Sequence, residues 1–530
     1  MPTLTINNFG GRLTRYNDGD INSGLCKYST TFGNDAFTSP GNLSWFEAPT
    51  RIDTSETVIT DLIMAARPRL ESGKTFVYAI GHTGRLYKIQ VNDPTTFDPD
   101  FDNPVLLATL TDESPTFKFG ASIQFFGASE KLFIGHDRGV TKIAFDGTGE
   151  AFVNTQASYV SDVPRPSVNF TGKLYFGNGE NLLTIDSTED VTDFSTLDPA
   201  FPDGTQVRDV DVSPDGNYVQ IVVSRVAQAD MTTNTQDTSA LSSADSYFIF
   251  WNGIDEGYTS YNPYNAYSLN ANTTFGPFSY TMGYDSDGTA VYSLGQKILS
   301  LPNSQSPNFN AMFSTGNLVG FGSPENDASD AVLKGSLLLY GGYDIEIPQG
   351  LYRPFRLTAT TQTDVQQVPM CAVVSNLFYG ASSAGYTDNI IGSAKLYFST
   401  LETDSGPTSK FKLYKFTTVP TGSGTAIAGV YETQNQIFSK KIKVGEIRIY
   451  AEPFVTDNEF TVELIGSDNG VISGSSKTFT VGTNVTAGDD IVRYSPEIAP
   501  TYTLGVRITN SGSKNWVGTK IEIDVNEGGT

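Results

Sequence analysis

The chain has 530 residues, 38% of them hydrophobic and only 17% charged, so it is long enough to bury sizeable cores in two to four domains. Its 58 acidic and 34 basic residues leave a net charge of −24, which argues against wrapping nucleic acid and against adsorption to an anionic membrane. The sequence contains no apolar run of about 18 residues, so it predicts no membrane-spanning helix. The start of the chain has neither the basic nor the apolar part of a secretory signal.

The composition predicts an all-β protein with almost no helix. The chain contains 51 Gly, 34 Phe and 26 Tyr, and short aromatic-rich runs alternate with stretches of Gly, Thr, Ser and Asn. This texture is typical of many strands joined by many turns. In chain order, we predict an N-terminal arm over residues 1–42, a β-propeller over residues 43–420 and an antiparallel β-sandwich or jelly roll over residues 421–530.

A hairpin phrase recurs in the first half of the chain. In each copy a short apolar strand leads into a tight turn containing glycine, and a second strand follows and ends in Ile. The pivot glycines are Gly81, Gly135 and Gly177, which lie 54 and 42 positions apart. One hairpin at this spacing suits one blade of a propeller.

Weaker copies of the phrase continue the repeat to about residue 416. They are Tyr218–Val226 with Tyr247–Trp251, Ala290–Leu301, Ser336–Leu357 and Lys395–Phe416. The repeat therefore predicts about seven blades. Strands around Leu43–Ile63 are expected to complete the last blade and close the ring, which removes open sheet edges.

The C-terminal part has a different pattern. Thr421–Thr425 is rich in Gly and Ser and reads as a linker. Beyond it, six or more short segments alternate apolar and polar residues with a period of two, which is what an antiparallel sandwich or jelly roll requires.

Motifs for catalysis, metal binding and cofactor binding are missing from the sequence. There is no Gly-x-Ser-x-Gly, no His-Glu-x-x-His and no Cys-x-x-Cys. The two histidines, His82 and His136, follow the pivot glycine in successive hairpins, so their position indicates turn geometry rather than a paired site. We predict no enzyme, no catalytic residue, no metal and no cofactor.

Two acidic segments could bind a cation or be solvated loops, and two cysteines could form a disulfide or remain free thiols. Asp98–Asn103 and Asp285–Gly288 resemble the opening of a calcium loop, but the first has Asn and Thr where an EF-hand needs Gly and Glu. Solvated acidic loops are favoured, with a bridged cation as the alternative. Cys26 and Cys371 are expected to be unpaired thiols, with a disulfide as the alternative.

Both ends of the chain resemble a known group of proteins. The phrase Ile6–Leu13, containing Asn-Phe-Gly-Gly, is similar to the start of many tailed-phage structural proteins, and Asp18–Asn22 and Pro40–Leu43 resemble later landmarks. The propeller followed by Tyr431–Thr433 and the basic strand Ser439–Val444 is similar to phage tail propeller proteins. In architecture the chain most resembles the tail nozzle proteins of short-tailed phages.

The resemblance implies a structural virion protein, made in the host cytoplasm and located in the tail. It would assemble with copies of itself as a ring below the adaptor, contact adaptor and fibre proteins, form the distal tail channel and let DNA pass during ejection. Nozzle proteins often run longer and carry extra platform domains. A reduced nozzle, a fibre-attachment adaptor and a decorating protein are therefore the open alternatives.

A receptor-binding or carbohydrate-binding or -cleaving tail module is the alternative function. It would use propeller loops such as Gln228–Asp245, or the tyrosine-rich stretch whose rings suit stacking on host surface glycans. Those tyrosines are Tyr258, Tyr261, Tyr264 and Tyr267. The plain interpretation is a loop packed against a neighbouring blade.

Subunits that all carry a net negative charge need an attractive contact between them in order to assemble. An acidic channel wall lets a polyanion pass without arrest, but it also makes subunits repel one another. The basic run that contains Lys440, Lys441 and Lys443 is the predicted contact with an acidic neighbour. The alternative is a plain solvated strand.

Overall fold

The computed structural model describes most of the chain. The described residues are 2–17, 19–52, 59, 61–72, 74–91, 103–111, 115–127, 131–153, 159–187, 189, 191–193, 201–228, 230–231, 246–255, 257–275, 277–301, 312–315, 318–326, 333–341, 349–358, 367–374, 395–401, 411–417 and 425–527. In these residues the regular structure is all strand, and no helix is long and apolar enough to cross a membrane.

The chain divides into two compact units. The first consists of Met1–Pro49, Leu338–Arg356 and Phe416–Thr530, and the second of Thr50–Leu337 and Leu357–Lys415. The second unit holds most of a β-propeller, and the first holds the N-terminal segment together with the C-terminal sandwich. The predicted fold class, a propeller followed by a C-terminal sandwich, is confirmed.

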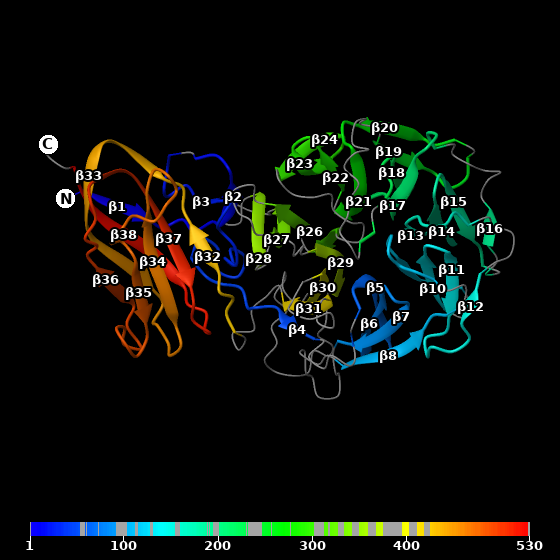
Figure 1. Cartoon of the computed structure of the whole chain (residues 1–530), viewed down its shortest axis with the longest axis horizontal. Coiled ribbons are helices and arrows are strands. Elements are labelled where there is room, and N and C mark those ends of the chain that lie inside the picture. The colour runs from blue at the N-terminus through cyan, green and yellow to red at the C-terminus, as the bar shows by residue number, and fades with distance from the viewer. Residues whose placement is uncertain are drawn as a thin grey trace. The chain divides into compact units, whose positions relative to one another are not determined.

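Seven four-stranded antiparallel sheets form the blades within the described residues (Figure 1). Six of them use consecutive strands. The predicted hairpins supply the two middle strands of the first four blades, whereas Ala290–Leu301 and Ser336–Leu357 correspond to the third and fourth strands of their blades. These six blades are β5–β8 (Ile63–Glu71, Lys74–Gly81, Arg85–Gln90, Asn103–Thr109), β9–β12 (Ser122–Phe126, Lys131–His136, Gly139–Ile143, Ala151–Phe152), β13–β16 (Ser167–Phe170, Lys173–Asn178, Asn181–Ile185, Val191–Asp193), β17–β20 (Gln206–Val212, Val219–Ser224, Ser246–Trp251, Ser260–Tyr264), β21–β24 (Ser268–Phe275, Phe278–Asp285, Gly288–Ser293, Gln296–Leu301) and β25–β28 (Met312–Thr315, Leu318–Asn326, Leu333–Gly341, Gly350–Thr358).

The seventh blade combines strands from distant parts of the chain. It contains β29 (Gln367–Val374), β30 (Lys395–Leu401) and β31 (Phe411–Thr417), and its outermost strand is β4 (Thr50–Arg51). Tyr414 of β31 pairs with Arg51, so a strand that precedes the first blade closes the last one. A strand from the predicted segment Leu43–Ile63 thus completes the last blade, and within the described residues it is limited to Thr50–Arg51.

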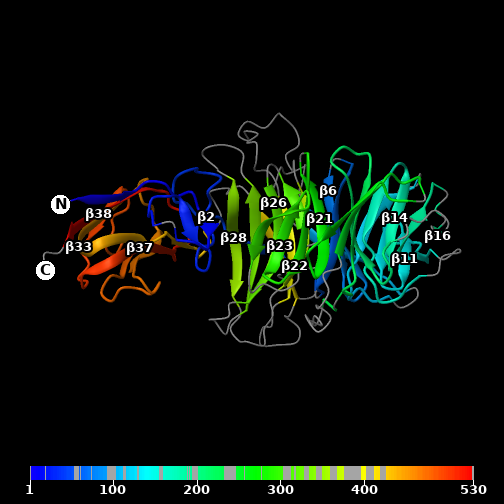
Figure 2. The ribbon, with the colours of Figure 1, turned by 90° about the horizontal axis from the view of Figure 1, so that it is seen from above.

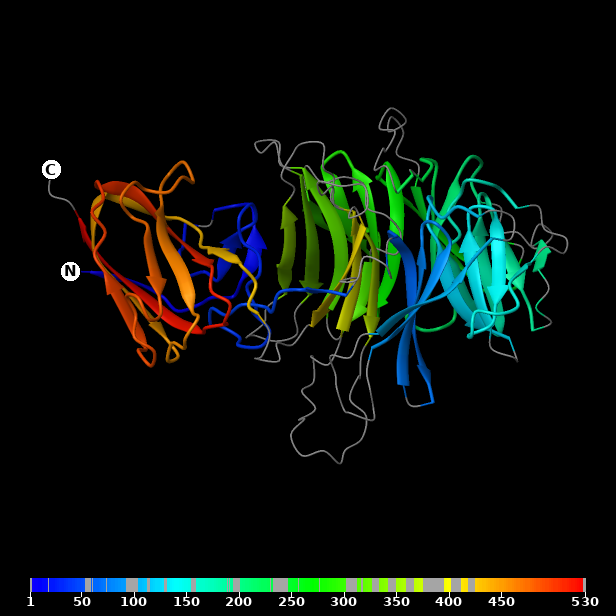
Figure 3. The same ribbon diagram turned by 60° about the horizontal axis from the view of Figure 1, so that its bottom comes forward.

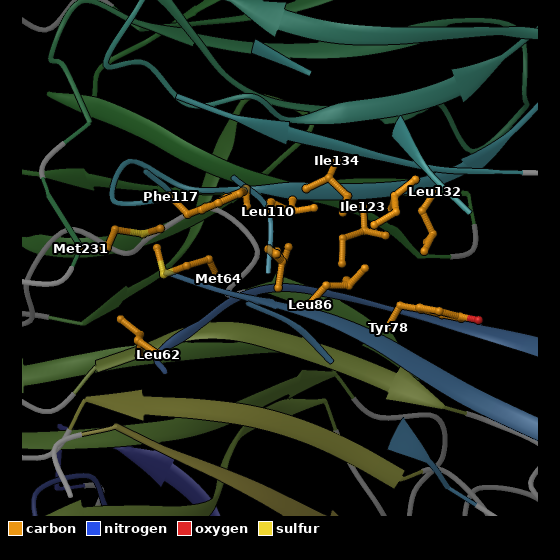
Figure 4. Close-up of a cluster of buried hydrophobic side chains, with 14 residues drawn as sticks. Leu62, Met64, Tyr78, Leu86, Leu110, Phe117, Ile123, Leu132, Ile134 and Met231 are labelled. Carbon is orange, nitrogen blue, oxygen red and sulfur yellow. The ribbon is translucent and has the colours of Figure 1, made fainter. Parts of the chain in front are cut away.

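The first strand of each blade lies innermost, and these seven strands contact one another in sequence, with β29 returning to β5. Figure 2 shows the blades edge-on, with their strands running across the thickness of the propeller. Apolar side chains fill the spaces between blades. Figure 4 shows one such core, in which Leu86 and Tyr78 of one blade meet Ile123, Leu132 and Ile134 of the next.

The C-terminal sandwich has two layers that share long strands (Figure 3). One layer contains β1, β38, β33 and β36, and the other contains β32, β37, β34 and β35. Their bounds are β1 Thr3–Ile6, β32 Val430–Glu432, β33 Gln436–Ala451, β34 Glu459–Ile465, β35 Lys477–Thr480, β36 Ile491–Tyr494, β37 Thr501–Asn510 and β38 Gly518–Glu527. The N-terminal β1 pairs with the last strand, and β2 (Arg12–Thr14) and β3 (Leu25–Lys27) form a small parallel pair.

Candidate functional site

The predicted assembly lysines lie where β33 passes from one sheet of the sandwich to the other. Ile437 pairs with Thr503 of β37, whereas Ile442 pairs with Thr501, so the register shifts across the residues between them. From Ile442 onward β33 pairs with β38 instead. This irregularity lifts Lys440 and Lys441 out of the regular ladder and exposes both side chains.

Apolar and basic side chains gather at this irregularity. Ile437 is 61% exposed and Tyr502 is 51% exposed, while the ammonium of Lys441 lies 5.6 Å from the centre of the Tyr502 ring. Lys440 reaches Glu527 at 3.8 Å, but both side chains are mostly exposed, and such a pair stabilises little. We call Ile437, Lys440, Lys441, Lys443 and Tyr502 the β33 patch; its lysines remain available to another acidic surface.

The four predicted glycan tyrosines do not share one environment. Tyr261 is exposed and its ring lies 5.6 Å from that of the half-buried Tyr258. Tyr264, only 5% exposed, packs edge-on against Tyr292 in the core next to β21. The prediction that Tyr264 contacts a glycan is therefore wrong, because its ring is buried between β20 and the next blade. Tyr267 is half-buried beside Tyr284.

An open groove lies beside Tyr258, with a volume of about 630 Å³. Two aromatic rings, Tyr218 and Tyr258, line it together with polar side chains. The polar lining residues are Asn217, Asn252, Asp255 and Thr259. Aromatic rings next to amides and a carboxylate can stack on a sugar ring and bind its hydroxyl groups. The other predicted binding loop, Gln228–Asp245, lies almost entirely outside the described residues.

Polar side chains connect the innermost strands of the propeller. Because these strands are sheet edges, their inner N–H and C=O groups lack partners within their own blades. Gln124 of β9 donates to the carbonyl of Ser167 at 2.8 Å, and Asp209 of β17 accepts from the backbone N–H of Asn272 at 2.7 Å. The side chains therefore join one blade to the next around the axis.

A polar cavity of about 340 Å³ lies among the innermost strands, lined by residues of β5, β9, β13, β17, β21 and β25. Its charged lining residues, within the described chain, are Arg67, Asp209 and Asp211. Burial raises the pKa of Asp209 well above its usual value and raises that of Asp211 to about 6. Burial also lowers the pKa of Arg67, and this effect exceeds the opposite effect of the negative charge of Asp211, which raises it.

The raised pKa of Asp211 predicts that its ionised form destabilises the propeller. An unfolded aspartate has a pKa near 3.9, so the folded chain binds more protons between about pH 4 and pH 6. The stability that the protonated Asp211 carboxyl contributes is therefore lost as the pH rises from about 4 to about 6. We expect Asp211→Asn to be about 1 kcal/mol more stable than the native chain at pH 7.5, with no advantage at pH 4, in urea unfolding. An equal advantage at both pH values would contradict this.

His136 bonds within its own hairpin, whereas His82 bonds to the segment that precedes the first strand of its blade. The ring Nδ1 of His82 accepts the backbone N–H of Leu62 at 3.2 Å, and Nε2 of His136 lies 3.0 Å from the hydroxyl of Thr141. Burial lowers the pKa of His136 to about 3, so its ring is neutral at physiological pH. A buried neutral ring held by its own hairpin fits the predicted turn role.

The remaining sequence candidates hold no metal cluster in the part of the chain that the structure describes. Asp285 accepts the hydroxyl of Tyr292 at 2.9 Å and pairs with Lys297 at 2.9 Å. Most of Asp98–Asn103 and the side chain of Cys371 lie outside the described residues. Cys26 is buried and unpaired, and burial raises its thiol pKa to about 12.

The two terminal phrases that resemble phage tail proteins contact each other inside the first unit. The Phe9 ring lies 5.6 Å from the Tyr431 ring, and both side chains are fully buried. Thr31 and Glu432 exchange hydrogen bonds through the Thr31 hydroxyl, at 3.0 and 3.4 Å. Gly11 has a φ of +68°, and a Cβ there would lie 2.3 Å from the amide nitrogen of Asn34, so only glycine fits.

No protein-family model and no curated protein matches the chain. Among solved structures it is similar to the computationally designed Ika8 protein, at 12% identity over 67% of this chain and 97% of that one, with a TM-score of 0.36. It is also similar to the extracellular domain of the putative hybrid two-component system BT4673 from B. thetaiotaomicron, at 9% identity over 88% of this chain and 61% of that one, with a TM-score of 0.39. A third similar structure is the Neurospora crassa Pan2 WD40 domain, at 9% identity over 68% of this chain and 90% of that one, with a TM-score of 0.35. These likenesses carry no argument about function.

Proposed function

We propose that the chain is a structural subunit of a phage tail, of the nozzle or channel-ring type, that assembles with copies of itself and lets DNA pass. One observation carries the proposal: the N-terminal Asn-Phe-Gly-Gly phrase and the Tyr431–Thr433 phrase, which resemble phage tail proteins separately, pack together as one buried cluster. Two distant phrases that build one structural element form a more specific resemblance than either phrase alone.

The charge distribution supports assembly between copies. The chain carries a net charge of −24, and the β33 patch places three lysines beside two exposed apolar side chains. An acidic, partly apolar surface on a neighbouring subunit complements this patch. Charge complementarity guides the encounter, while burial of the apolar side chains supplies affinity.

Electron microscopy of the purified protein, followed by mass spectrometry of purified virions, tests the proposal. We expect closed rings of the isolated protein and its presence in virions at a fixed copy number per tail. A strictly monomeric protein that is absent from purified virions would overturn the proposal.

Glycan binding at the host surface is the second candidate function, favoured by the groove beside Tyr258. We expect Tyr258→Ala to weaken binding of host polysaccharide by about three- to tenfold, because one stacking ring is lost. Glycan-array or calorimetric measurements give the affinities. Tyr16→Ala, which removes a ring that is 82% exposed elsewhere in the chain, is the matched control. Equal losses in both variants, or no binding by the native chain, would exclude this groove.

A further inference from the structure

The axial cavity has a cationic wall and an anionic wall. Arg67 lies on β5 of the first blade, and Asp209 and Asp211 lie on β17 of the fourth, on opposite sides of the ring of innermost strands (Figure 1). Arg67 lines the cavity and is an exposed residue, yet enough protein surrounds its side chain to lower its pKa. In the part of the chain that the structure describes, no ion pair joins Arg67 to Asp211. The charge of Asp211 acts on the pKa of Arg67 from a greater distance.

Neutral polar groups of the lining also lack partners. Both amide atoms of Asn272 are buried without a hydrogen-bond partner, and the residue is only 6% exposed. The hydroxyl of Ser167, on the neighbouring β13, is likewise buried without a partner. Asn272 lies directly beside the anionic wall, because its backbone N–H donates to Asp209. A buried polar group without a partner is costly, so these groups indicate a ligand that hydrogen-bonds to them.

The anionic wall has the donor–acceptor chemistry that suits an ammonium group. Asp209 and Asp211 are two residues apart on one strand, so their side chains share a face. Both already accept backbone N–H groups, from Asn272 and Val212 respectively, which fixes their orientation. Together with Oδ1 of Asn272, they offer three acceptor groups, and a primary ammonium has three donors.

The cationic wall suits a carboxylate. A guanidinium presents its donors in a fixed fork that matches the two oxygens of a carboxylate. A singly charged ligand satisfies one wall and leaves the other without a partner. No aromatic ring lines the cavity within the described residues, so the stacking that sugars require is missing.

We propose that the axial cavity binds a small zwitterion, with a primary ammonium at Asp209 and Asp211 and a carboxylate at Arg67, such as a free amino acid. The volume of about 340 Å³ accommodates a molecule of this class. The site is independent of the proposed tail role, since it lies inside a single chain and needs no ring.

Isothermal titration calorimetry of the full chain tests the proposal with matched probes. Glycine, 4-aminobutyrate and 6-aminohexanoate separate the two charges by increasing lengths, while butylamine and butyrate each carry one of the two charges of 4-aminobutyrate. We expect at least one zwitterion to bind at least tenfold more tightly than both singly charged probes. Arg67→Gln should reduce its affinity to that of butylamine, and Asp211→Asn should reduce it at least tenfold.

Asp203→Asn, which removes an exposed carboxylate outside the cavity, is the control and should leave affinity unchanged. Circular dichroism and urea unfolding confirm that each variant is folded. Binding of butylamine as tight as that of the zwitterions would overturn the proposal in favour of an ammonium site. Failure of every probe to bind, or an unchanged affinity in Arg67→Gln, would also overturn it.

Discussion

Replacing Lys440 and Lys441 together by glutamate is expected to prevent ring assembly while leaving the monomer folded. Both side chains are exposed at the irregularity of β33, so neither supports the core of the sandwich. The double substitution turns two positive charges into two negative ones on a chain whose net charge is already −24. Attraction at the β33 patch then becomes repulsion at every subunit interface of the ring.

We expect self-association to weaken at least tenfold in analytical ultracentrifugation, and incorporation into virions to fall with it. Lys477→Glu with Arg493→Glu is the matched control, because it makes the same charge change on exposed positions of β35 and β36. Raising the salt concentration should weaken assembly of the native chain, since screening reduces the attraction. If the Lys440 and Lys441 double variant assembles normally, these lysines are surface decoration and the interface lies elsewhere.

The first three blades were predictable from sequence because one physical requirement recurs in them. The pivot glycines stand where a neighbouring segment passes close by: a Cβ on Gly81 would lie 2.4 Å from the Cβ of Asp61, and one on Gly135 would lie 2.8 Å from the Cβ of Arg165. Only glycine permits that approach, so the residue type repeats with the blade. Close approach of a neighbouring segment therefore explains glycine at these positions better than the tight turn predicted from the sequence does.

The axial cavity was not predicted, although its signal is present in the sequence. The alternation in Asp209-Val210-Asp211-Val212 predicts a strand and nothing about its partners. Alternation puts both carboxylates on one face, but their meeting with Arg67 depends on which strand of each blade is innermost. That order is set by closure of the ring, in which β29 returns to β5.

The misplacement of Tyr264 has a related cause. Four tyrosines at a spacing of three residues look like one surface, but β20 ends at Tyr264 and alternates its side chains between two faces. The burial pattern of the strand changes from exposed to buried at this last residue. A spacing pattern cannot show which face of an outer strand meets the neighbouring blade.

Arg165→Leu is expected to destabilise the propeller by about 3–5 kcal/mol, because it breaks a buried hydrogen-bond network around a charged group. The Arg165 side chain is fully buried and joins two blades. Its Nε donates to the carbonyl of His136 at 3.0 Å, and its Nη1 donates to the carbonyl of Gly177 at 3.1 Å. Further bonds run to the side chain of Asn178 and the carbonyl of Val160.

Burial lowers the Arg165 pKa to about 10, so the side chain keeps its positive charge at neutral pH, where these acceptors surround it. Leucine fills part of the space but leaves the buried acceptors without donors, and each such group costs about 1–3 kcal/mol. The control is Arg138→Leu in the preceding hairpin, where the half-exposed side chain reaches Asp137 at 3.7 Å and contributes about 0–1 kcal/mol. Urea unfolding monitored by circular dichroism gives both values. Equal losses in the two variants would mean that the Arg165 network does not stabilise the contact between blades.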